Sequence, residues 1–324
     1  MKYVLAPLAG FTDAPFRRLC SECGADLTYT EMVSAAGLAY GSSPTRHLME
    51  VMPGEGPVAC QIFGAKETDI ALAARIVDGV SSSREPTARF VEINLNAGCP
   101  MTKVTREGAG AKLVEDPEKI YRLLKAMTEN TGLPVTLKTR IGPHPRKTNI
   151  FEILDAAENA GAKGIVVHAR YTSQMHGGPV HLDVLSEVVR RARIPVTGNG
   201  SVVDAGSAAL MAETGVDAIM IGRTAMANPD VFRQLKNVGC SSSSAPGRSL
   251  VERHLEYLLA FREQLAANFP DDRIPSVDGF VSVKMHVHLF RYFNGRPGAA
   301  ALRARLNNVR TLSEIKEIVN GNLR

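Results

Sequence analysis

Short apolar segments rich in β-branched residues alternate with helical segments over most of this chain, and the alternation strongly constrains the fold. The helical segments carry apolar residues at the spacing of one helix face, as in Ile120, Leu123, Leu124 and Met127. Eight strand-then-helix units over about 220 residues are typical of a (β/α)8 TIM barrel, an α/β fold; a doubly wound open sheet is the alternative. The expected strands are 4–9, 27–32, 58–63, 90–96, 135–141, 164–169, 194–200 and 218–222, with helices at 71–77, 117–127, 151–159 and 184–192.

A serine-rich segment separates this region from the C-terminal part of the chain. Residues 237–247 contain four consecutive serines at 241–244, followed by alanine, proline and glycine, a composition typical of a linker. Strand-like runs stop there, so we expect a catalytic barrel domain over 1–240 and a small helical bundle over 248–324. The helices of that bundle are expected at 250–268, 276–292, 299–307 and 313–319.

The composition of the 324-residue chain excludes several classes of protein. Apolar residues make up 44% and charged residues 22%, as in ordinary globular domains. No uninterrupted apolar run approaches the roughly 20 residues of a membrane helix, and we interpret the apolar N-terminus as a core strand, not a signal peptide. The odd count of five cysteines argues against a disulfide scaffold and favours a cytoplasmic setting. We also expect a monomer without a metal ion.

Four of the cysteines have no predicted role in chemistry. Cys20 and Cys23 have C-x-x-C spacing, but they fall in an expected helix at 16–23 and have no second pair, which argues against a zinc or redox site. Cys60 lies within an expected strand and is interpreted as a core residue. Cys240, beside the serine run, receives no interpretation.

Polar or glycine residues occur at the ends of all eight expected strands. In a barrel of parallel strands the loops after the carboxyl ends carry the chemistry, whereas buried strands are otherwise apolar. One polar residue at a strand end is commonly a cap, but eight of eight indicates a site. These residues are 9–13, Thr30 and Glu31, Gln61, Asn94 and Asn96, Lys138 and Arg140, His168 and Arg170, 198–201, and Gly222 and Arg223.

Two of these segments lie where barrels of this kind bind phosphate. Gly198-Asn199-Gly200 follows the seventh expected strand and Gly222-Arg223 follows the eighth. Glycine permits close approach of a phosphate to the backbone, and an arginine guanidinium donates paired hydrogen bonds to its oxygens. Two tight turns are the alternative for each motif alone, but their place on adjacent strands favours a phosphate site.

Lys138 and Cys99 are the candidates for chemistry at the barrel mouth. An unpaired interior lysine is costly, so Lys138 is expected to meet an anion or an electron-rich heterocycle, with an ion pair to Glu92 as the structural alternative. Cys99 lies in a loop with glycine before it and proline after it. A thiol there is suited to act as a nucleophile or general acid, and a small buried apolar residue is the alternative.

These motifs together resemble the dihydrouridine synthase family, flavoenzymes that reduce uridine in tRNA. The resemblance covers nearly the whole chain, and the cysteine segment is its most specific element. Leu8 stands where the family more often has methionine, and Ser201 where it often has an acidic residue. The matching segments are 6–13 (APLAGFTD), 96–100 (NAGCP), 138–140 (KTR), 168–170 (HAR), 198–200 (GNG), 222–223 (GR) and 228–229 (NP).

The resemblance implies an FMN held over the barrel mouth, with NADPH as the reductant. A hydride would then pass from the reduced flavin to the uracil ring, and Cys99 would donate a proton from the opposite face. Asn96 and Arg170 would grip the uracil edge, with Arg140 nearby. An FMN barrel that acts on a free pyrimidine, similar to dihydroorotate dehydrogenase, is the alternative. The implied cofactor contacts are Pro7, Leu8, Ala9, Gln61, Lys138, His168, Asn199, Gly200, Ser201, Gly222 and Arg223.

A basic segment in the C-terminal part of the chain predicts a surface for tRNA. No aspartate or glutamate occurs between positions 284 and 310. Such a segment favours a polyanion-binding face, and a charged helix surface that is merely solvated is the alternative. The aromatic residues of the segment are expected in the core. Lys103, in a loop near Cys99, would extend the face toward the barrel. The predicted tRNA contacts in the basic segment are Lys284, Arg291, Arg303 and Arg305, with Arg296 and Arg310 alongside.

Overall fold

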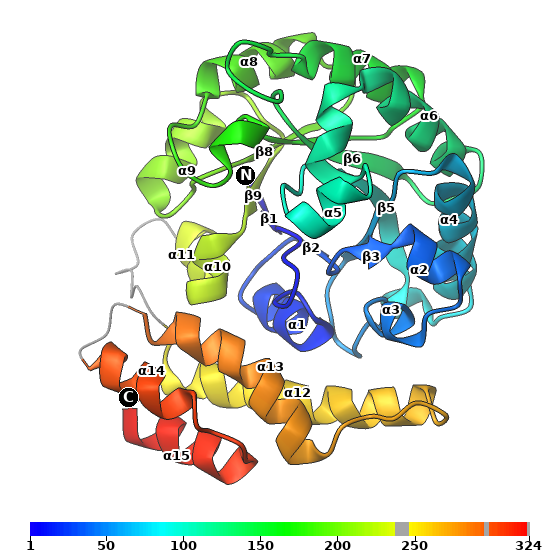
Figure 1. The fold of residues 1–324 in the computed structure, drawn as a ribbon. Coiled ribbons are helices and arrows are strands. Elements are labelled where there is room, and N and C mark those ends of the chain that lie inside the picture. Colours follow the sequence, from blue (N-terminus) through cyan, green and yellow to red (C-terminus); the bar gives the residue numbers. More distant parts are fainter. Residues whose placement is uncertain (237–245, 295–297, 323–324) are drawn as a thin grey trace.

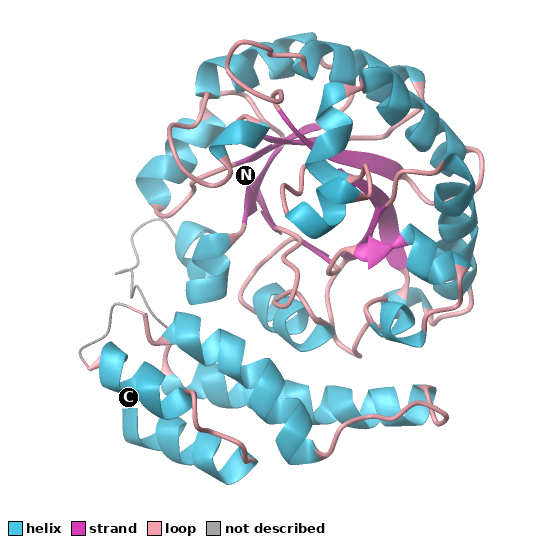
Figure 2. Ribbon diagram, viewed as in Figure 1, coloured by secondary structure: helices cyan, strands magenta, loops and turns pink. Residues whose placement is uncertain are grey.

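The computed structural model describes residues 1–236, 246–294 and 298–322. Eight parallel strands close into a barrel, because β2 pairs with β1 on one side and with β4 on the other. Helices surround this ring (Figure 1, Figure 2), which confirms the TIM barrel and excludes the open sheet. The strands are β1 Lys2–Leu5, β2 Leu27–Tyr29, β3 Val33–Ser34, β4 Val58–Phe63, β5 Phe90–Ala97, β6 Val135–Arg140, β7 Ile165–His168, β8 Val196–Asn199 and β9 Ala218–Ile221.

The first strand ends earlier than its sequence predicts. β1 stops at Leu5, where it pairs with Ile221 of β9, so the predicted extent of 4–9 is wrong. Pro7 has no N–H for a sheet ladder, and the chain then turns because Phe11 and Thr12 both donate to the Leu8 carbonyl. As a result, residues 7–9 form a loop at the barrel mouth.

The second strand is interrupted, which the sequence did not reveal. In place of one strand over 27–32, β2 pairs with the start of β4, and β3 pairs with its end through Val33 and Ile62. Between them, the Thr30 hydroxyl accepts the N–H of Gln61 and so replaces a backbone partner. The interruption places Glu31 outside the sheet ladder, beside the loop that follows β1.

The outer helices form because each presents an apolar stripe to the sheet. In α6, Ile120, Leu123, Leu124 and Met127 are all 0% exposed, and each such burial contributes about 1.5–3 kcal/mol. Asp116 caps this helix by accepting the N–H of Lys119. The barrel helices are α1 Ala14–Glu22, α2 Ala35–Ala39, α3 Ser43–His47, α4 Glu67–Ser82, α5 Thr102–Arg106, α6 Pro117–Thr128, α7 Ile150–Asn159, α8 Leu182–Arg191, α9 Ala205–Ala212, α10 Arg223–Ala227 and α11 Val231–Lys236, with 3-10 turns at Pro86–Ala88, Gly110–Glu115 and Thr172–Gln174.

In the described residues after position 245, the chain forms four helices that lie together beside the barrel (Figure 1). Here α12 packs against α1, and α13 packs against α10. Residues 237–245 of the expected linker, with the boundary at residue 240 and Cys240, fall outside the described residues, as does Arg296, so the two-domain division stays a prediction. The helices are α12 Arg248–Asn268, α13 Val277–Tyr292, α14 Ala299–Leu306 and α15 Leu312–Asn322.

Cys60 is buried as predicted, and so are Tyr292 and Phe293 among the aromatic residues expected in the core, whereas Phe290 is only half-buried. Cys20 and Cys60 are 0% exposed and Cys23 is 2% exposed, and burial raises the pKa of Cys23 and of Cys60 to about 12, so both remain neutral thiols. Tyr292 and Phe293 are also fully buried. In the described part of the chain, no helix has the length and apolar character needed to span a membrane.

Candidate active site at the barrel mouth

The loop after β5 holds the Cys99 thiol at the barrel mouth in a defined shape. The side-chain oxygen of Asn96 accepts the N–H groups of Gly98, at 3.1 Å, and of Cys99, at 3.0 Å. The Cys99 carbonyl accepts the N–H of Ala111 at 2.8 Å. A side chain at Gly110 would stand 2.6 Å from that carbonyl, and φ there is +59°, so only glycine fits. The thiol itself is partly exposed.

Arg140 braces this loop from the end of β6. It is 2% exposed, and its guanidinium donates to the carbonyl oxygens of Gly98, Tyr171 and Met175. Arg140 therefore joins the thiol loop to the loop that follows β7. These bonds engage Nε and Nη1 of the guanidinium, and the predicted contact of Arg140 with the substrate remains a prediction.

A chain of hydrogen bonds between buried side-chain amides holds Asn96 in place beneath the thiol loop, on the side of the barrel interior. The Asn96 amide donates to the Gln61 oxygen at 2.8 Å, and the Gln61 amide donates to the Asn94 oxygen at 2.7 Å. Gln61 is fully buried and Asn96 is 4% exposed. Asn96 thus organises the thiol loop, while the contacts predicted for these two residues with uracil and flavin remain predictions.

Lys138 points from β6 into the mouth without an acidic partner among the described residues. Its Nζ donates to the side-chain oxygen of Asn199 at 3.2 Å. The alternative ion pair with Glu92 is absent, because that carboxylate accepts from Tyr29 and Thr136. Burial, reinforced by Arg140, lowers the pKa of Lys138 to about 7. A negative charge on Cys99 would raise the pKa of Lys138 and of Arg140, so the Cys99 sulfur lies close enough to both cations to interact with them electrostatically.

Arg170, Arg223 and His168, a histidine that burial keeps neutral, lie near one another after β7 and β9. His168 is 9% exposed and Arg170 is 4% exposed, and each has a buried nitrogen without a hydrogen-bond partner in the described structure. Burial lowers the pKa of His168 strongly, and Lys138, Arg140 and Arg170 lower it further. Arg223 lies close enough to lower the pKa of Arg170. An anion placed here would satisfy the unpartnered donors and relieve the repulsion.

The glycine segment after β8 places backbone without a side chain beside Arg170 and His168. A side chain at Gly200 would approach Arg170 Nη1 at 3.7 Å and His168 Nε2 at 3.8 Å, and φ there is +134°. Ser201 adopts a φ of +53° and accepts from Arg170 through its hydroxyl. These contacts support the prediction of a phosphate cradle, because glycine leaves the cationic groups accessible.

The loop after β1 closes the same mouth with apolar surface. Pro7 and Leu8 are half-buried, whereas Ala9 is exposed. Gly222, which precedes α10, lies next to this loop, because a Cβ built on it would be 3.7 Å from Leu8 Cδ2. The predicted cofactor residues on β1, β6, β7, β8 and β9 are therefore gathered at one end of the barrel.

A groove with two arginines lies between the loop after β1 and the C-terminal helices. It is lined by Phe11 of the loop after β1, by α13 and by Arg303 of α14. The Arg291 guanidinium lies 5.8 Å from the Phe11 ring centroid. Arg305 is exposed on α14, and Lys103 is exposed on α5, immediately after the thiol loop. These four cations remain predicted tRNA contacts.

Lys284 lies beside two carboxylates of the barrel. Its Nζ lies 3.3 Å from Asp13 Oδ2 and 3.9 Å from Glu31 Oε1, both in the barrel. The sequence of α13 alone shows no acidic neighbour, because these partners are more than 250 residues away along the chain. The contact of Lys284 with tRNA remains a prediction, although two carboxylates of the barrel already lie beside its ammonium group.

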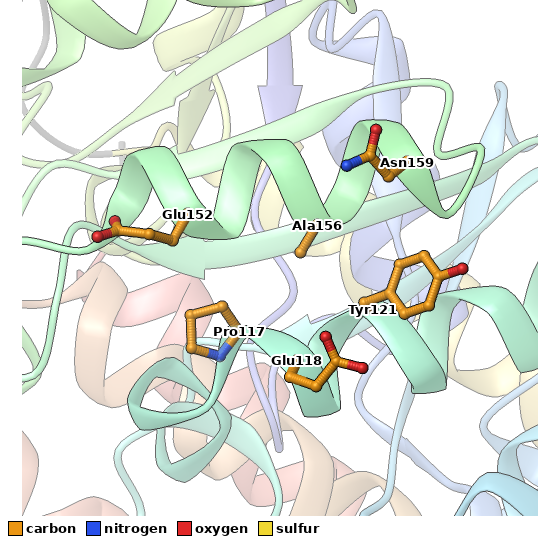
Figure 3. A pocket seen from close by; sticks show the side chains of 6 residues that line it. All are labelled: Pro117, Glu118, Tyr121, Glu152, Ala156 and Asn159. Carbon is orange, nitrogen blue, oxygen red and sulfur yellow. The ribbon is translucent and has the colours of Figure 1, made fainter.

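A second groove lies on the outer surface of the barrel, away from this chemistry. It runs between α6 and α7 and is lined by Pro117, Glu118, Tyr121, Glu152 and other residues (Figure 3). Its two carboxylates and the absence of cations or thiols in its lining do not suit a phosphate or flavin. It is not part of the candidate site.

His176 is the residue at the mouth that sequence reasoning missed. Its ring centroid lies 6.5 Å from that of His168, and burial followed by Arg140 and Arg223 lowers its pKa. It belongs to a glycine-rich loop after β7 that carries no recognised motif. The run His176-Gly177-Gly178 after a strand was the available signal.

Comparison with known proteins identifies the family. The family model described as dihydrouridine synthase (Dus) matches residues 4–323. The chain belongs to the dihydrouridine synthase family. It is 35% identical to tRNA-dihydrouridine synthase B of Klebsiella pneumoniae over 252 residues, which cover 78% of this chain and 76% of that protein. The protein of the same name from Yersinia pestis is 36% identical over 235 residues, with 72% and 71% covered.

A solved structure supports the fold independently. An old yellow enzyme homologue from Zymomonas mobilis superposes with a TM-score of 0.54 at 13% identity, over 75% of this chain and 90% of that one. At this identity the likeness concerns the barrel alone. The family model and the curated relatives confirm the predicted family, and the solved structure confirms the barrel fold.

Proposed function

We propose that this chain reduces uridine in tRNA to 5,6-dihydrouridine, with FMN as cofactor and NADPH as reductant. One observation carries the proposal: the partly exposed Cys99, on a braced loop, shares the barrel mouth with a glycine-lined cradle whose cationic groups have no acidic partner among the described residues. Family membership supports the substrate, because the relatives bear the name tRNA-dihydrouridine synthase B.

The residues of the mouth fit FMN. His168 presents a buried nitrogen without a hydrogen-bond partner in the described structure, and Arg223 lies on the same side of the mouth, close to Arg170, so His168 and Arg223 suit the phosphate end of the cofactor. Gly200, Ser201 and Gly222 would admit it, while Pro7, Leu8 and Ala9 would lie against the ring, with Gln61 and Asn199 at its polar edge. When bound, FMN would take a hydride from NADPH and supply it to the uracil ring.

Lys138 and Cys99 have complementary roles in this proposal. Lys138, held by Asn199 at 3.2 Å, would stabilise the negative charge of the reduced flavin ring with its ammonium group. The Cys99 thiol would donate its proton to uracil carbon 5 from the face opposite the hydride. Asn96 would hold the thiol in place, and Arg170 is the proposed donor to the uracil edge. One hydride and one proton complete the reduction.

The helical domain would supply affinity for RNA. Drawing a uridine out of its stack costs about a few kcal/mol, and phosphate contacts must offset that cost. The groove lined by Phe11, Arg291 and Arg303 leads to the loop after β1. Arg305 and Lys103 would extend the basic surface on either side of it. We propose a cytoplasmic, monomeric enzyme, because the substrate and reductant are found there.

The test of this function is a reconstituted reaction. The full chain is incubated with FMN, NADPH and tRNA lacking dihydrouridine, and the nucleosides are analysed by mass spectrometry. We expect dihydrouridine in tRNA and none from free uridine or free orotate. Product from a free pyrimidine at a comparable rate would instead support the enzyme class similar to dihydroorotate dehydrogenase. NADH in a parallel reaction tests the preference for NADPH.

A further inference from the structure

The helical domain reaches the cofactor side of the barrel through Lys284. This side chain, 29% exposed, lies between Asp13, which follows the loop after β1, and Glu31, which follows β2. Asp13 also caps α1, since its other oxygen accepts the N–H of Phe16. Both carboxylates therefore belong to the barrel, whereas the cation between them belongs to α13.

Glu31 connects this ion cluster to the backbone of the loop at 7–12. Its Oε2 accepts the N–H of Gly10, where φ is +78°. Within the loop, Leu8 donates to the Thr12 hydroxyl at 3.0 Å. The conformation of the loop that carries residues 7–9 therefore depends on Glu31, which accepts the Gly10 N–H.

The charges of the cluster depend on one another. Burial raises the pKa of Glu31, and Lys284 opposes this effect. Burial alone would lower the pKa of Lys284, but Asp13 and Glu31 together raise it above its ordinary value. Lys284 is therefore charged at neutral pH. Without its ammonium, two buried carboxylates would face each other across the loop, a strongly destabilising arrangement.

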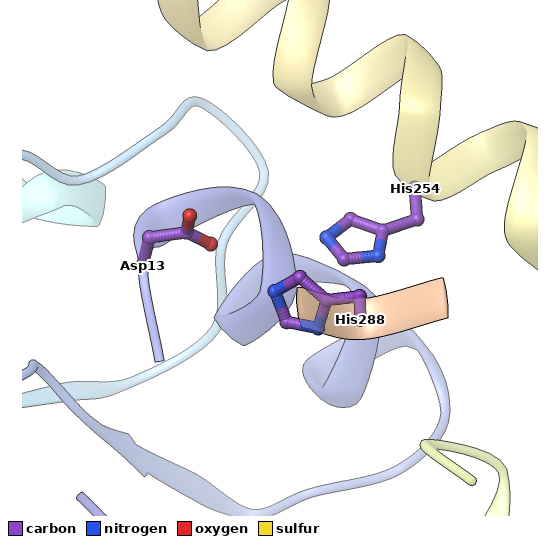
Figure 4. Close-up of side chains that lie close together, drawn as sticks. All are labelled: Asp13, His254 and His288. Atoms are coloured by element: carbon purple, nitrogen blue, oxygen red, sulfur yellow. The ribbon is translucent and has the colours of Figure 1, made fainter. Parts of the chain in front are cut away.

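Two buried histidines complete the cluster on the side of the helical domain (Figure 4). One nitrogen each of His254 and His288 and an oxygen of Asp13 lie within 4.8 Å of one another, a spacing compatible with a metal ion. However, the Lys284 ammonium is already 3.3 Å from the same carboxylate, and a divalent ion would be repelled by it. We therefore assign the cation of this cluster to Lys284.

We propose that Lys284 is a positioning residue through which the helical domain fixes the loop at 7–12 against the cofactor. The identity of the cofactor rests on the proposed function, whereas the contact between Lys284 and the loop does not. The domain that binds tRNA and the loop that lies against the flavin are coupled by this ammonium group. Flavin affinity therefore depends on a residue outside the barrel.

The test compares Lys284→Met with Lys316→Met in the full chain. Methionine preserves most of the volume of lysine but not its charge, and Lys316 is an exposed lysine of α15 in the same domain. Hydrogen exchange is measured by mass spectrometry on peptides covering residues 6–13, and FMN affinity by fluorescence quenching. We expect about tenfold faster exchange in these peptides and about tenfold weaker FMN binding for Lys284→Met, with Lys316→Met unchanged.

A second variant separates this role from mere space filling. Adding Glu31→Gln to Lys284→Met leaves an oxygen to accept from Gly10 and removes the repulsion between Glu31 and Asp13, so slow exchange and FMN affinity are expected to recover in part. Unchanged exchange in Lys284→Met would overturn the proposal, as would faster exchange spread evenly over both domains. If the wild-type chain fails to form dihydrouridine, the proposed function fails, while the exchange result still decides the role of Lys284.

Discussion

The lowered pKa of Lys138 predicts how cofactor affinity changes with pH. In the protein without cofactor this pKa is about 7, because burial disfavours the charged form and Arg140 adds repulsion. Beside an anionic group the pKa would return toward its ordinary value of about 10.4. FMN therefore binds best when Lys138 is protonated. Its affinity is full below about pH 7 and is lost as the pH rises through that value.

The size of the effect follows from the two pKa values. Between about pH 7.5 and about pH 9, Lys138 loses its proton in most molecules of the cofactor-free protein. The FMN dissociation constant is therefore expected to rise about twentyfold over this range. The phosphate of FMN is fully ionised throughout this range, since its second pKa is about 6. Quenching of FMN fluorescence by the cofactor-free protein measures the affinity. Lys138→Met should bind more weakly and show no such slope. A slope of equal size in that variant, or a flat wild-type profile, would refute the reasoning.

Four further changes test separate parts of the site. Lys138→Met should raise the Tm of the cofactor-free protein at neutral pH, by a stabilisation of about 1 kcal/mol after allowance for solvent screening; a lower Tm would show that the lysine is well paired. Cys99→Ala should retain FMN and its reduction by NADPH but lose dihydrouridine formation by at least about a hundredfold, and full activity would remove Cys99 as the acid. Gly110→Ala should destabilise the thiol loop by about 1–3 kcal/mol and reduce product formation, measured by urea unfolding and turnover; wild-type values would show that the loop relaxes freely. Replacing Arg303 and Arg305 together by alanine should lower the salt slope of tRNA binding by about 1.5, whereas an unchanged slope would place the RNA elsewhere.

The sequence predicted the barrel because its signal is repeated eight times along the chain. Each outer helix carries its own apolar stripe, so errors in one element do not affect the others. The extent of the first strand was wrong, since the run through Pro7 reads as apolar while proline ends the ladder. The interruption between β2 and β3 was missed, because a hydroxyl that replaces a backbone partner, as at Thr30, leaves no periodic signature.

The candidate site was predictable where a motif lies at a strand end, and less so where a role depends on distant partners. The motifs placed Cys99 and Lys138 at the mouth from local sequence alone. By contrast, Arg140 braces three backbone carbonyls, and Lys284 meets carboxylates contributed by the barrel. Charge patterning along one segment cannot show partners that only the folded chain brings together.

The central claim is that a thiol and a flavin at one barrel mouth act together on a uridine of tRNA. The most direct measurement is the dihydrouridine content of tRNA from a strain that lacks this chain, with and without the restored wild-type or Cys99→Ala chain. The account predicts that wild-type restores dihydrouridine at defined positions and that Cys99→Ala does not. Unaltered dihydrouridine at every position in the deleted strain, together with no product from the purified chain, would contradict it.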